Sequence, residues 1–348
     1  MTAFAYYRLP YLHHAHYVAQ REGEPEVLSS VAELNGKEGF VIAPFSPSSD
    51  CPVLLIHPDE SKLLPISDAK AISTSDSTLG EDASDRDAYA GAFECFHQEL
   101  EKGTFRKIVL ARKATVRTAA KDFEKLFMKA CRMYPRLFVS LVYTPQSGMW
   151  LMATPEILLK GEQGNMSTMS LAGTQKAEPS RTVADYPVEG VEWSRKNQEE
   201  QQYVTDYIED CIKAFSDDYQ LKGPYTTMAA NLYHLRTDIS FRLRDEGRLG
   251  DVIDALYPTP AVCGIPKDEA RRFILQHEHQ PRKYYSGFVG PVSPQGKTHL
   301  FVSLRCMNIL PDGACELYAG GGLLKESEME KEWKETEAKM QTIRRVLL

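Results

Sequence analysis

The sequence lacks any apolar run long enough to cross a membrane as a helix. None of its hydrophobic stretches approaches the roughly 18 residues that a membrane span requires. The N-terminal segment, MTAFAYYRLPYLHHAHYV, also lacks the basic stretch followed by an apolar one that is typical of a secretory signal. We therefore expect a cytoplasmic protein with no membrane partner.

Paired cysteines and an excess of positive charge are also missing. The seven cysteines are scattered and contain no C-x-x-C pair, which is typical of reduced thiols and not of a disulfide framework or a zinc site. Lys and Arg number 41 against 48 Asp and Glu, a net charge of −7. We expect no nucleic-acid partner, and an anionic substrate would have to be attracted by local positive groups.

What is present is an ordinary globular composition in a chain that is long for one simple core. Of the 348 residues, 43% are hydrophobic and 26% are charged, so one large domain and two packed halves are both open. Residues 1–80 form the N-terminal part of the main body, where apolar stretches such as Gly39–Ala43 predict strands. The small, polar residues 66–86 predict an exposed connection, and a more regular region follows from residue 87 to 348.

The segment 317–348 combines three glycines with a charged helix pattern. Gly320–Gly322 follow an apolar stretch and precede a run without Pro or Gly, which predicts a strand, a tight turn and a helix. Backbone amides exposed at such a turn would suit an anion.

Acidic residues on the predicted helix fall on its inner edge. Glu328, Glu332, Glu335 and Lys339 recur at helical spacing, and the same stripe continues into apolar residues. Carboxylates at a buried edge need a partner, and a hard divalent cation such as Mg²⁺ would supply one. The alternative is a solvated acidic helix after an ordinary glycine turn.

Two further charged residues stand beside apolar strands. Lys107 precedes Ile108–Leu110; it is either a surface residue whose stem covers apolar atoms or a base whose pKa is lowered by desolvation. Glu156 lies between a proline and the apolar Ile157–Leu159, an unfavourable place for a solvated carboxylate and a suitable one for a carboxyl group of raised pKa.

Other candidates lie in the segments between. Met169–Thr174 predicts a small-residue turn that allows close approach of a ligand, and Glu200 falls on the inner face of a helix over about 194–215. His234 lies in an apolar strand, as a hydrogen-bonded core histidine or a site residue. Arg305 lies in the apolar segment His299–Met307, which predicts a strand, and a buried arginine demands an anion.

Together these motifs resemble the chorismate-utilising enzymes of menaquinone, siderophore and tryptophan biosynthesis, and among them the isochorismate synthases. The resemblance covers about residues 90–348 and is highly specific as a set. It implies an α/β fold with large, mainly antiparallel sheets flanked by helices, and it makes 87–348 a chorismate-binding catalytic domain. The motifs are Lys107-Ile-Val-Leu, Ala153-Thr-Pro-Glu156, Leu171-Ala-Gly-Thr174, Glu200, Pro258-Thr-Pro-Ala261, Leu304-Arg-Cys306, Ala319-Gly-Gly-Gly and Glu332-Trp-Lys-Glu335.

The resemblance also implies roles for individual residues. Lys107 would be the base that activates water for attack at C2 of chorismate, and Glu156 the acid that protonates the departing C4 hydroxyl, with His234 near the enolpyruvyl side. Mg²⁺ would be held by Glu200 and Glu335, with Glu332 close by or bound through water. The remaining substrate-binding residues would be Gly173, Thr174, Thr259, Ala261, Arg305, Gly320 and Lys339.

The sequence departs from the family pattern at two places. Where many relatives have a histidine after the metal-binding glutamate, this chain has Gln201, so either Glu199 or Glu200 could face the metal; the helical face favours Glu200. The glycines replace Gly-Ala-Gly, a change expected to add flexibility.

Three related activities remain as alternatives to isochorismate formation. Ammonia-using anthranilate synthases carry glutamine where this chain has Lys107, so a lysine favours water and no glutaminase subunit is expected. Salicylate synthases share the lysine and then eliminate pyruvate, and a non-catalytic chorismate-binding protein is the third alternative. We expect a monomer with chorismate and isochorismate as its ligands.

Overall fold

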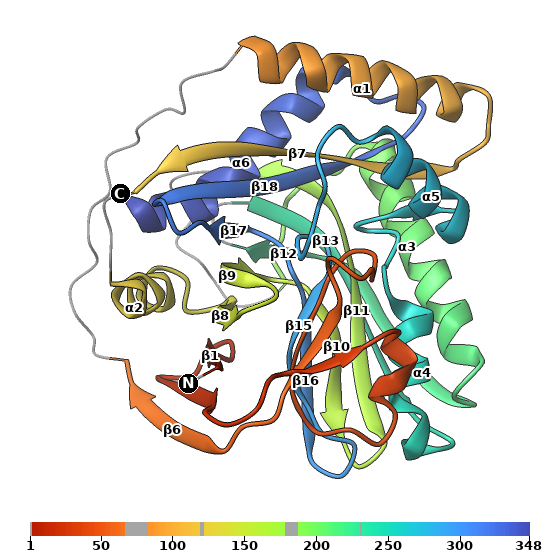
Figure 1. Cartoon of the computed structure of the whole chain (residues 1–348). Coiled ribbons are helices and arrows are strands. Elements are labelled where there is room, and N and C mark those ends of the chain that lie inside the picture. Colours follow the sequence, from red (N-terminus) through yellow and green to blue (C-terminus); the bar gives the residue numbers. More distant parts are fainter. Residues whose placement is uncertain (1, 67–82, 119–121, 178–186, 230–231) are drawn as a thin grey trace.

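Two nine-stranded antiparallel sheets form the body of the protein. The computed structural model describes residues 2–66, 83–118, 122–177, 187–229 and 232–348 (Figure 1). Most of the predicted connection 66–86 therefore lies outside the described residues. Sheet A has the strand order β14 (Gly264–Ile265), β7 (Lys107–Arg117), β18 (Ala314–Leu323), β17 (Cys306–Ile309), β9 (Gly148–Thr154), β8 (Phe138–Thr144), β1 (Ala3–Arg8), β2 (His14–Gln20) and β6 (Glu60–Pro65).

Sheet B is built in the same way from the other half of the strands. Its order is β12 (Asp218–Ala229), β13 (Leu232–Arg242), β11 (Asn165–Lys176), β10 (Ile157–Glu162), β16 (Lys297–Val302), β15 (Phe288–Val292), β4 (Gly39–Ala43), β5 (Val53–Ile56) and β3 (Glu26–Leu28). The strands before residue 66 thus extend both sheets, β1 by pairing with β8 and β4 by pairing with β15.

Six helices flank the sheets in the described residues. They are α1 (Ala83–Glu101), α2 (Phe123–Met133), α3 (Arg195–Lys213), α4 (Leu249–Leu256), α5 (Lys267–His277) and α6 (Met329–Leu347), with short 3₁₀ turns at Val31–Leu34 and Glu246–Arg248. In Figure 1, α1 crosses over β7, and α3 packs against β11. None of the described helices is both long and apolar enough to span a membrane.

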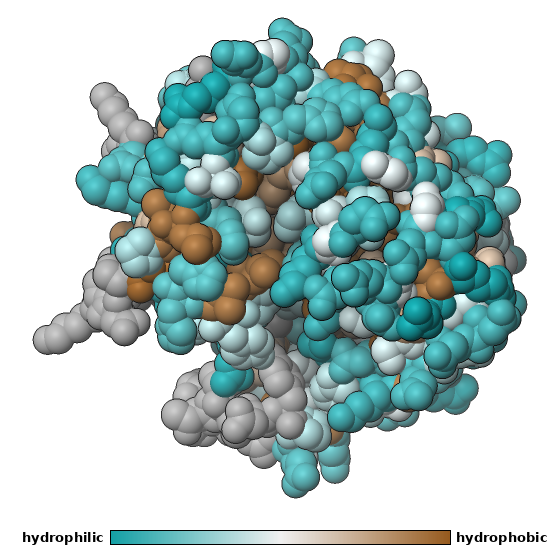
Figure 2. All heavy atoms as spheres, turned by 90° about the horizontal axis from the view of Figure 1, so that it is seen from below, coloured by the Kyte–Doolittle hydropathy of each residue, from teal (hydrophilic) through white to brown (hydrophobic). Residues whose placement is uncertain are grey.

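Apolar side chains fill the space between the two sheets and beneath the helices. Phe138 of β8 stacks on Phe301 of β16 with ring centroids 4.1 Å apart, which joins the sheets face to face. Phe127 of α2 and Ile343 of α6 cover the other face of sheet A, and Ile208 of α3 covers sheet B. Hydrophilic residues predominate on the face seen in Figure 2, where hydrophobic ones form only small patches. The layers are therefore helix, sheet, sheet, helix, and the expected fold class is confirmed.

Most predicted elements are confirmed, but three local predictions are wrong. Gly320–Gly322 do not form a turn; they lie inside β18 and pair with β7 up to Leu323. Met169–Thr174 is not a turn either, because it belongs to β11, where the register shifts between Ala172 and Gln175.

The third correction concerns the segment around Arg305. His299–Met307 is not one strand, because β16 ends at Val302 in sheet B and β17 begins at Cys306 in sheet A. Arg305 lies at this crossing with a φ of 46°, a conformation that is uncommon for residues other than glycine. The crossing brings the arginine out of a sheet and into the space between the two.

Candidate active site

A cavity opens where β7 and β18 of sheet A approach β11 and β13 of sheet B. The empty space in and around it is about 600 Å³, part of which is open to solvent. Nine of the predicted site residues line it: Glu156, Gly173, Thr174, Glu200, His234, Ala261, Arg305, Gly320 and Lys339. Of the other four, Thr259, Lys107 and Glu335 each pair with a residue of this wall, whereas Glu332 lies beside Gly321, next to the lining residues Gly320 and Gly322. Segments far apart in the sequence thus converge on one cavity.

Glu156 is the buried acid of this cavity. It lies between β9 and β10, where the chain passes from sheet A to sheet B, and only 3% of the residue is exposed. Burial raises the pKa of Glu156 to about 7, although the charge of Lys107 and a hydrogen bond from Thr259 act in the opposite direction. The raised pKa favours the protonated carboxyl group, which is the form that a general acid requires.

Arg305 and His234 also line the cavity, one as a positively charged group and the other as a neutral one. His234 Nδ1 lies 2.8 Å from the carbonyl oxygen of Gly173, so this nitrogen is the donor. Burial and the charge of Arg305 lower the pKa of His234 to about 3, which keeps the imidazole neutral. Its Nε2 lies 3.4 Å from Arg305 Nη2.

The guanidinium of Arg305 has spare donors. Burial lowers the pKa of Arg305 to about 10, so the group is still charged at neutral pH. Its Nη1 is buried without a hydrogen-bond partner among the described residues. An unsatisfied buried cation that lines a cavity is suited to a carboxylate ligand.

Lys107 is fully buried and lies next to Glu200. Its Nζ is 3.0 Å from Glu200 Oε1, and no part of the residue is exposed, so a surface role is ruled out. Glu200 is held by α3, which begins after the N-cap Ser194; the side chain of Glu199 instead pairs with the exposed Arg195. The prediction that Glu200 is the inward-facing acid is confirmed.

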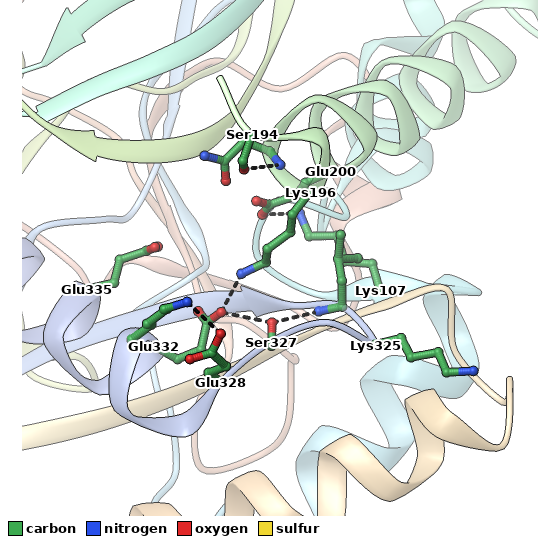
Figure 3. A network of polar contacts seen from close by, with 12 residues as sticks. Lys107, Ser194, Lys196, Glu200, Lys325, Ser327, Glu328, Glu332 and Glu335 are labelled. Atoms are coloured by element: carbon green, nitrogen blue, oxygen red, sulfur yellow. Dashed lines mark hydrogen bonds and ion pairs between the residues drawn. The ribbon is translucent and has the colours of Figure 1, made fainter. Parts of the chain in front are cut away.

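On α6, the predicted stripe of acids divides into an exposed and a buried part. Glu328 caps the helix from outside and pairs with Lys331, so it faces the solvent. Glu332 is 2% exposed, and its Oε1 accepts hydrogen bonds from Lys196 Nζ and, at 2.8 Å, from Ser327 Oγ (Figure 3). Its Oε2 is buried without a partner among the described residues. Burial, together with the charge of Glu335, raises the pKa of Glu332.

Glu335 is paired within the helix. Lys339 Nζ donates to Glu335 Oε1 at 2.6 Å and to the carbonyl oxygen of Gly320 at 2.8 Å. Burial alone would raise the pKa of Glu335, but the ammonium group of Lys339 outweighs it and the pKa is lowered. Lys339 thereby joins α6 to β18 at the edge of the cavity.

The glycines of β18 leave room for these carboxylates. A Cβ atom at Gly322 would lie 2.2 Å from Glu200 Oε1 and 2.8 Å from Lys107 Cε, and one at Gly321 would lie 2.9 Å from Glu332 Oε2 and 3.8 Å from Glu335 Oε1. The three acids therefore approach one short stretch of strand. The glycines provide space there, and they do not form the turn expected from the sequence.

The carboxylate oxygens of these three acids are donors of the kind that suits a hard divalent cation, but in this structure lysines hold the acids apart from such a site. Each acid is paired with an amine: Glu200 with Lys107, Glu332 with Lys196 and Glu335 with Lys339. As they stand, no three His, Cys, Asp or Glu side chains within the described ranges are placed to hold a metal ion. Oxygen ligands alone are nevertheless the donor set that Mg²⁺ prefers, and the unpartnered Oε2 of Glu332 faces the same glycines as Glu335.

Sequence reasoning missed three contributors to the site. Lys196 precedes Glu200 by four residues, so its presence on the same helical face was readable from the spacing. Tyr285 and Tyr318 line the cavity with rings stacked 5.5 Å apart. Nothing in their apolar surroundings distinguishes them from core residues in the sequence.

Comparisons with known proteins agree with this architecture. A family model described as chorismate binding enzyme matches residues 55–348. The chain is 32% identical to the salicylate biosynthesis isochorismate synthase of Pseudomonas aeruginosa over 57% of this chain and 42% of that protein. It is 30% identical to the isochorismate synthase MenF of Escherichia coli over 76% of this chain and 61% of that protein. The chain thus matches about two fifths to three fifths of the length of these relatives.

Solved structures show the same fold over nearly the whole chain. DhbC from Bacillus anthracis superposes with a TM-score of 0.82 at 22% identity, covering 99% of this chain and 95% of that one. The menaquinone-specific isochorismate synthase MenF of Escherichia coli superposes with a TM-score of 0.78 at 22% identity, covering 99% and 89%. With the cavity, the motifs and the family match in agreement, the chain belongs to the chorismate binding enzyme family.

Proposed function

We propose that this protein is a Mg²⁺-dependent isochorismate synthase, which adds water at C2 of chorismate and releases the hydroxyl group from C4. The observation that carries the proposal is a carboxyl group with a pKa of about 7, Glu156, that faces the same cavity as the buried Arg305. The amine of Lys107 lies directly behind that cavity, paired with Glu200 in its wall. An addition of water with loss of hydroxide requires one base, one acid and a site for an anion.

Each of these residues has one task in the proposed reaction. Arg305 binds a carboxylate of chorismate, and neutral His234 keeps Gly173 and the arginine in place. Lys107 accepts a proton from the attacking water, while Glu156 donates one to the departing hydroxyl. One water enters and one leaves, so the net reaction is an isomerisation, and acid and base terms of this kind contribute about 10²- to 10⁴-fold each.

The metal would assist by neutralising charge. Glu200, Glu332 and Glu335 would hold Mg²⁺, which would bind the ring carboxylate of the substrate. Glu200 would serve both groups in this arrangement, because the same carboxylate pairs with Lys107. The names of the relatives, both isochorismate synthases, support the activity.

Product analysis tests the proposal. The purified protein is incubated with chorismate and Mg²⁺, and isochorismate, salicylate, pyruvate and anthranilate are separated by chromatography. We expect isochorismate alone. Salicylate with equimolar pyruvate would identify a salicylate synthase, and tight chorismate binding without turnover would identify a binding protein.

A further inference from the structure

Lys196 has no role in the proposed reaction, yet it forms an ion pair with Glu332, one of the three buried acids Glu200, Glu332 and Glu335. It lies in the first turn of α3, and its side chain reaches across to α6, where Nζ donates to Glu332 Oε1 (Figure 3). The two residues are 136 positions apart in the chain. This ion pair is the direct bond between the start of α3 and the acids of α6.

The ammonium group of Lys196 is directed toward the acids of α6 (Figure 3). Its Nζ pairs with Glu332, and the carboxylates of Glu332 and Glu335 both approach Gly321. Lys107 and Lys339 each approach a single acid from the side of the strands or from within the helix. Lys196 is therefore the amine that reaches the acids of α6 from another helix.

Lys196 is also the amine that can leave most easily. A quarter of its side chain is exposed, against none for Lys107, and it is attached near the beginning of a helix on a long flexible stem. Glu332 would stay in place when the lysine leaves, because Ser327 Oγ still donates to the same oxygen at 2.8 Å. Its second oxygen, buried and unpartnered, is already available to a ligand.

We propose that the ammonium group of Lys196 holds the cation position in the metal-free protein and is displaced into solvent when a divalent cation binds. The inference rests on the proposed function only in placing a metal at Glu200, Glu332 and Glu335. It explains why these acids do not converge on a metal site while the lysine is present. An internal competitor lowers the apparent metal affinity by the fraction of molecules in which the site is open.

Direct metal binding tests the exchange without reference to turnover. Mn²⁺ serves as the probe, and the loss of the free-ion signal in electron paramagnetic resonance gives its Kd for the wild type, Lys196→Met and Lys196→Arg. If the site is open in roughly one molecule in ten, Lys196→Met should bind Mn²⁺ about tenfold more tightly, whereas Lys196→Arg, which keeps the charge and the pairing, should not. An unchanged or weaker affinity of Lys196→Met would mean that the lysine positions Glu332 and does not compete.

A matched control separates specific competition from general charge. Lys331→Met removes one positive charge from the start of α6, where Lys331 is 73% exposed and pairs with the outward-facing Glu328. We expect an unchanged Mn²⁺ affinity in this variant. An equal gain in Lys331→Met and Lys196→Met would overturn the proposal in favour of long-range electrostatics.

A second measurement uses the wild-type chain and requires no variant. Acetylation of lysines by an amine-reactive ester is followed by mass spectrometry with and without saturating Mn²⁺. Lys196 should be labelled several-fold faster when Mn²⁺ is bound, with Lys331 as an internal reference. If Mn²⁺ binds without faster labelling of Lys196, the displacement of the lysine is refuted and the metal site is not. If the wild-type protein binds no Mn²⁺, the metal site of the proposed function is refuted as well.

Discussion

Thr259 Oγ1 donates a hydrogen bond to Glu156 Oε1 over 3.4 Å, inside the wall of the cavity. The threonine belongs to the loop between α4 and β14, and the glutamate to the link between β9 and β10, so the bond ties two distant segments together. The bond favours the ionised carboxylate and opposes the effect of burial. The acidity of Glu156 is therefore set by a balance that single substitutions can shift.

Replacement of Glu156 by glutamine should remove the general acid and preserve its shape. We expect kcat for isochorismate formation to fall by about 10²- to 10⁴-fold with little change in the Kd of chorismate. Single-turnover kinetics and equilibrium dialysis measure the two quantities. Turnover close to wild type in Glu156→Gln would show that this carboxyl group only packs or orients.

The pH dependence of activity should report the same group. Because Glu156 must be protonated to act as the acid, kcat/KM should fall as the pH rises through about 7. Thr259→Val removes the hydrogen bond that favours the carboxylate, so the fall should move to higher pH while the maximal rate is retained. A basic limb that is insensitive to this substitution would assign the titration to another group.

The free energy of unfolding should also depend on the protonation of Glu156. The folded-state pKa of Glu156 is about 7 against an ordinary 4.5, so the folded protein binds more protons between these values and loses stability as the pH rises from 4.5 to 7. A shift of this size corresponds to about 3 kcal/mol. The lowered pKa of His234 has the reverse effect, because it makes the folded protein gain stability as the pH rises toward 6.5, the ordinary pKa of histidine. The contribution of Glu156 is therefore obtained as the difference in unfolding free energy between the wild type and Glu156→Gln, measured with urea across this pH range. A difference that is flat with pH would contradict the raised pKa.

Lys107 should be indispensable for hydration at C2. Lys107→Met preserves the length of a fully buried side chain, and we expect at least a 10²-fold loss of isochorismate formation while chorismate still binds. Lys107→Gln, which installs the residue of the ammonia-using relatives, should lose water addition equally. Retention of more than about a tenth of the wild-type rate in either variant would be too much for a protein without its base.

Activity should require a divalent cation, and two acids of the same helix provide a matched comparison. Chelation should abolish turnover and Mg²⁺ should restore it, with an increase in Tm of the wild type on Mg²⁺ addition. Glu335→Gln should lose both effects. Glu328→Gln, on the same stripe but facing solvent, should keep both. Full turnover in excess EDTA would remove the metal from the mechanism.

The glycines of β18 offer a further pair of substitutions. Gly322→Ala places a methyl group 2.2 Å from Glu200 Oε1 and 2.8 Å from Lys107 Cε, so it should separate the base from its partner and abolish turnover. Gly321→Ala meets the end of the flexible Glu332 side chain at 2.9 Å and Glu335 Oε1 at an ordinary contact distance of 3.8 Å, so most activity should remain. Equal loss of activity in the two variants would show that the effect of a side chain on β18 does not depend on which carboxylate it meets.

The sequence predicts those parts of the site that follow from local periodicity. Helical spacing identified Glu200 rather than Glu199 as the inner acid, and the apolar run after Lys107 identified a buried strand. The three glycines were misread because a glycine run is ordinarily a turn signal, whereas here the reason for glycine lies in Glu200 and Glu332, more than a hundred and about ten residues away. Local pattern cannot reveal a requirement imposed by a distant side chain.

Two other features depend on tertiary arrangement alone. The segment around Arg305 has the composition of one continuous strand, and no local signal shows that β16 and β17 belong to different sheets. The pairing of Glu332 with Lys196 was likewise hidden, because the two residues are 136 positions apart and meet only in the folded chain. The family resemblance supplied Arg305 and Glu332 as candidates, but it supplied neither Lys196 nor the contacts among these residues.

The contribution of the first strands to both sheets has a practical consequence for truncation. The family match begins at residue 55, which invites expression of a shortened protein, yet β1 covers the edge of β8 and β4 covers the edge of β15. A protein that starts at residue 55 would expose two unpaired strand edges at once, each able to recruit another chain. It should aggregate instead of yielding a smaller enzyme, and supplying residues 1–66 as a separate peptide should rescue solubility by strand complementation.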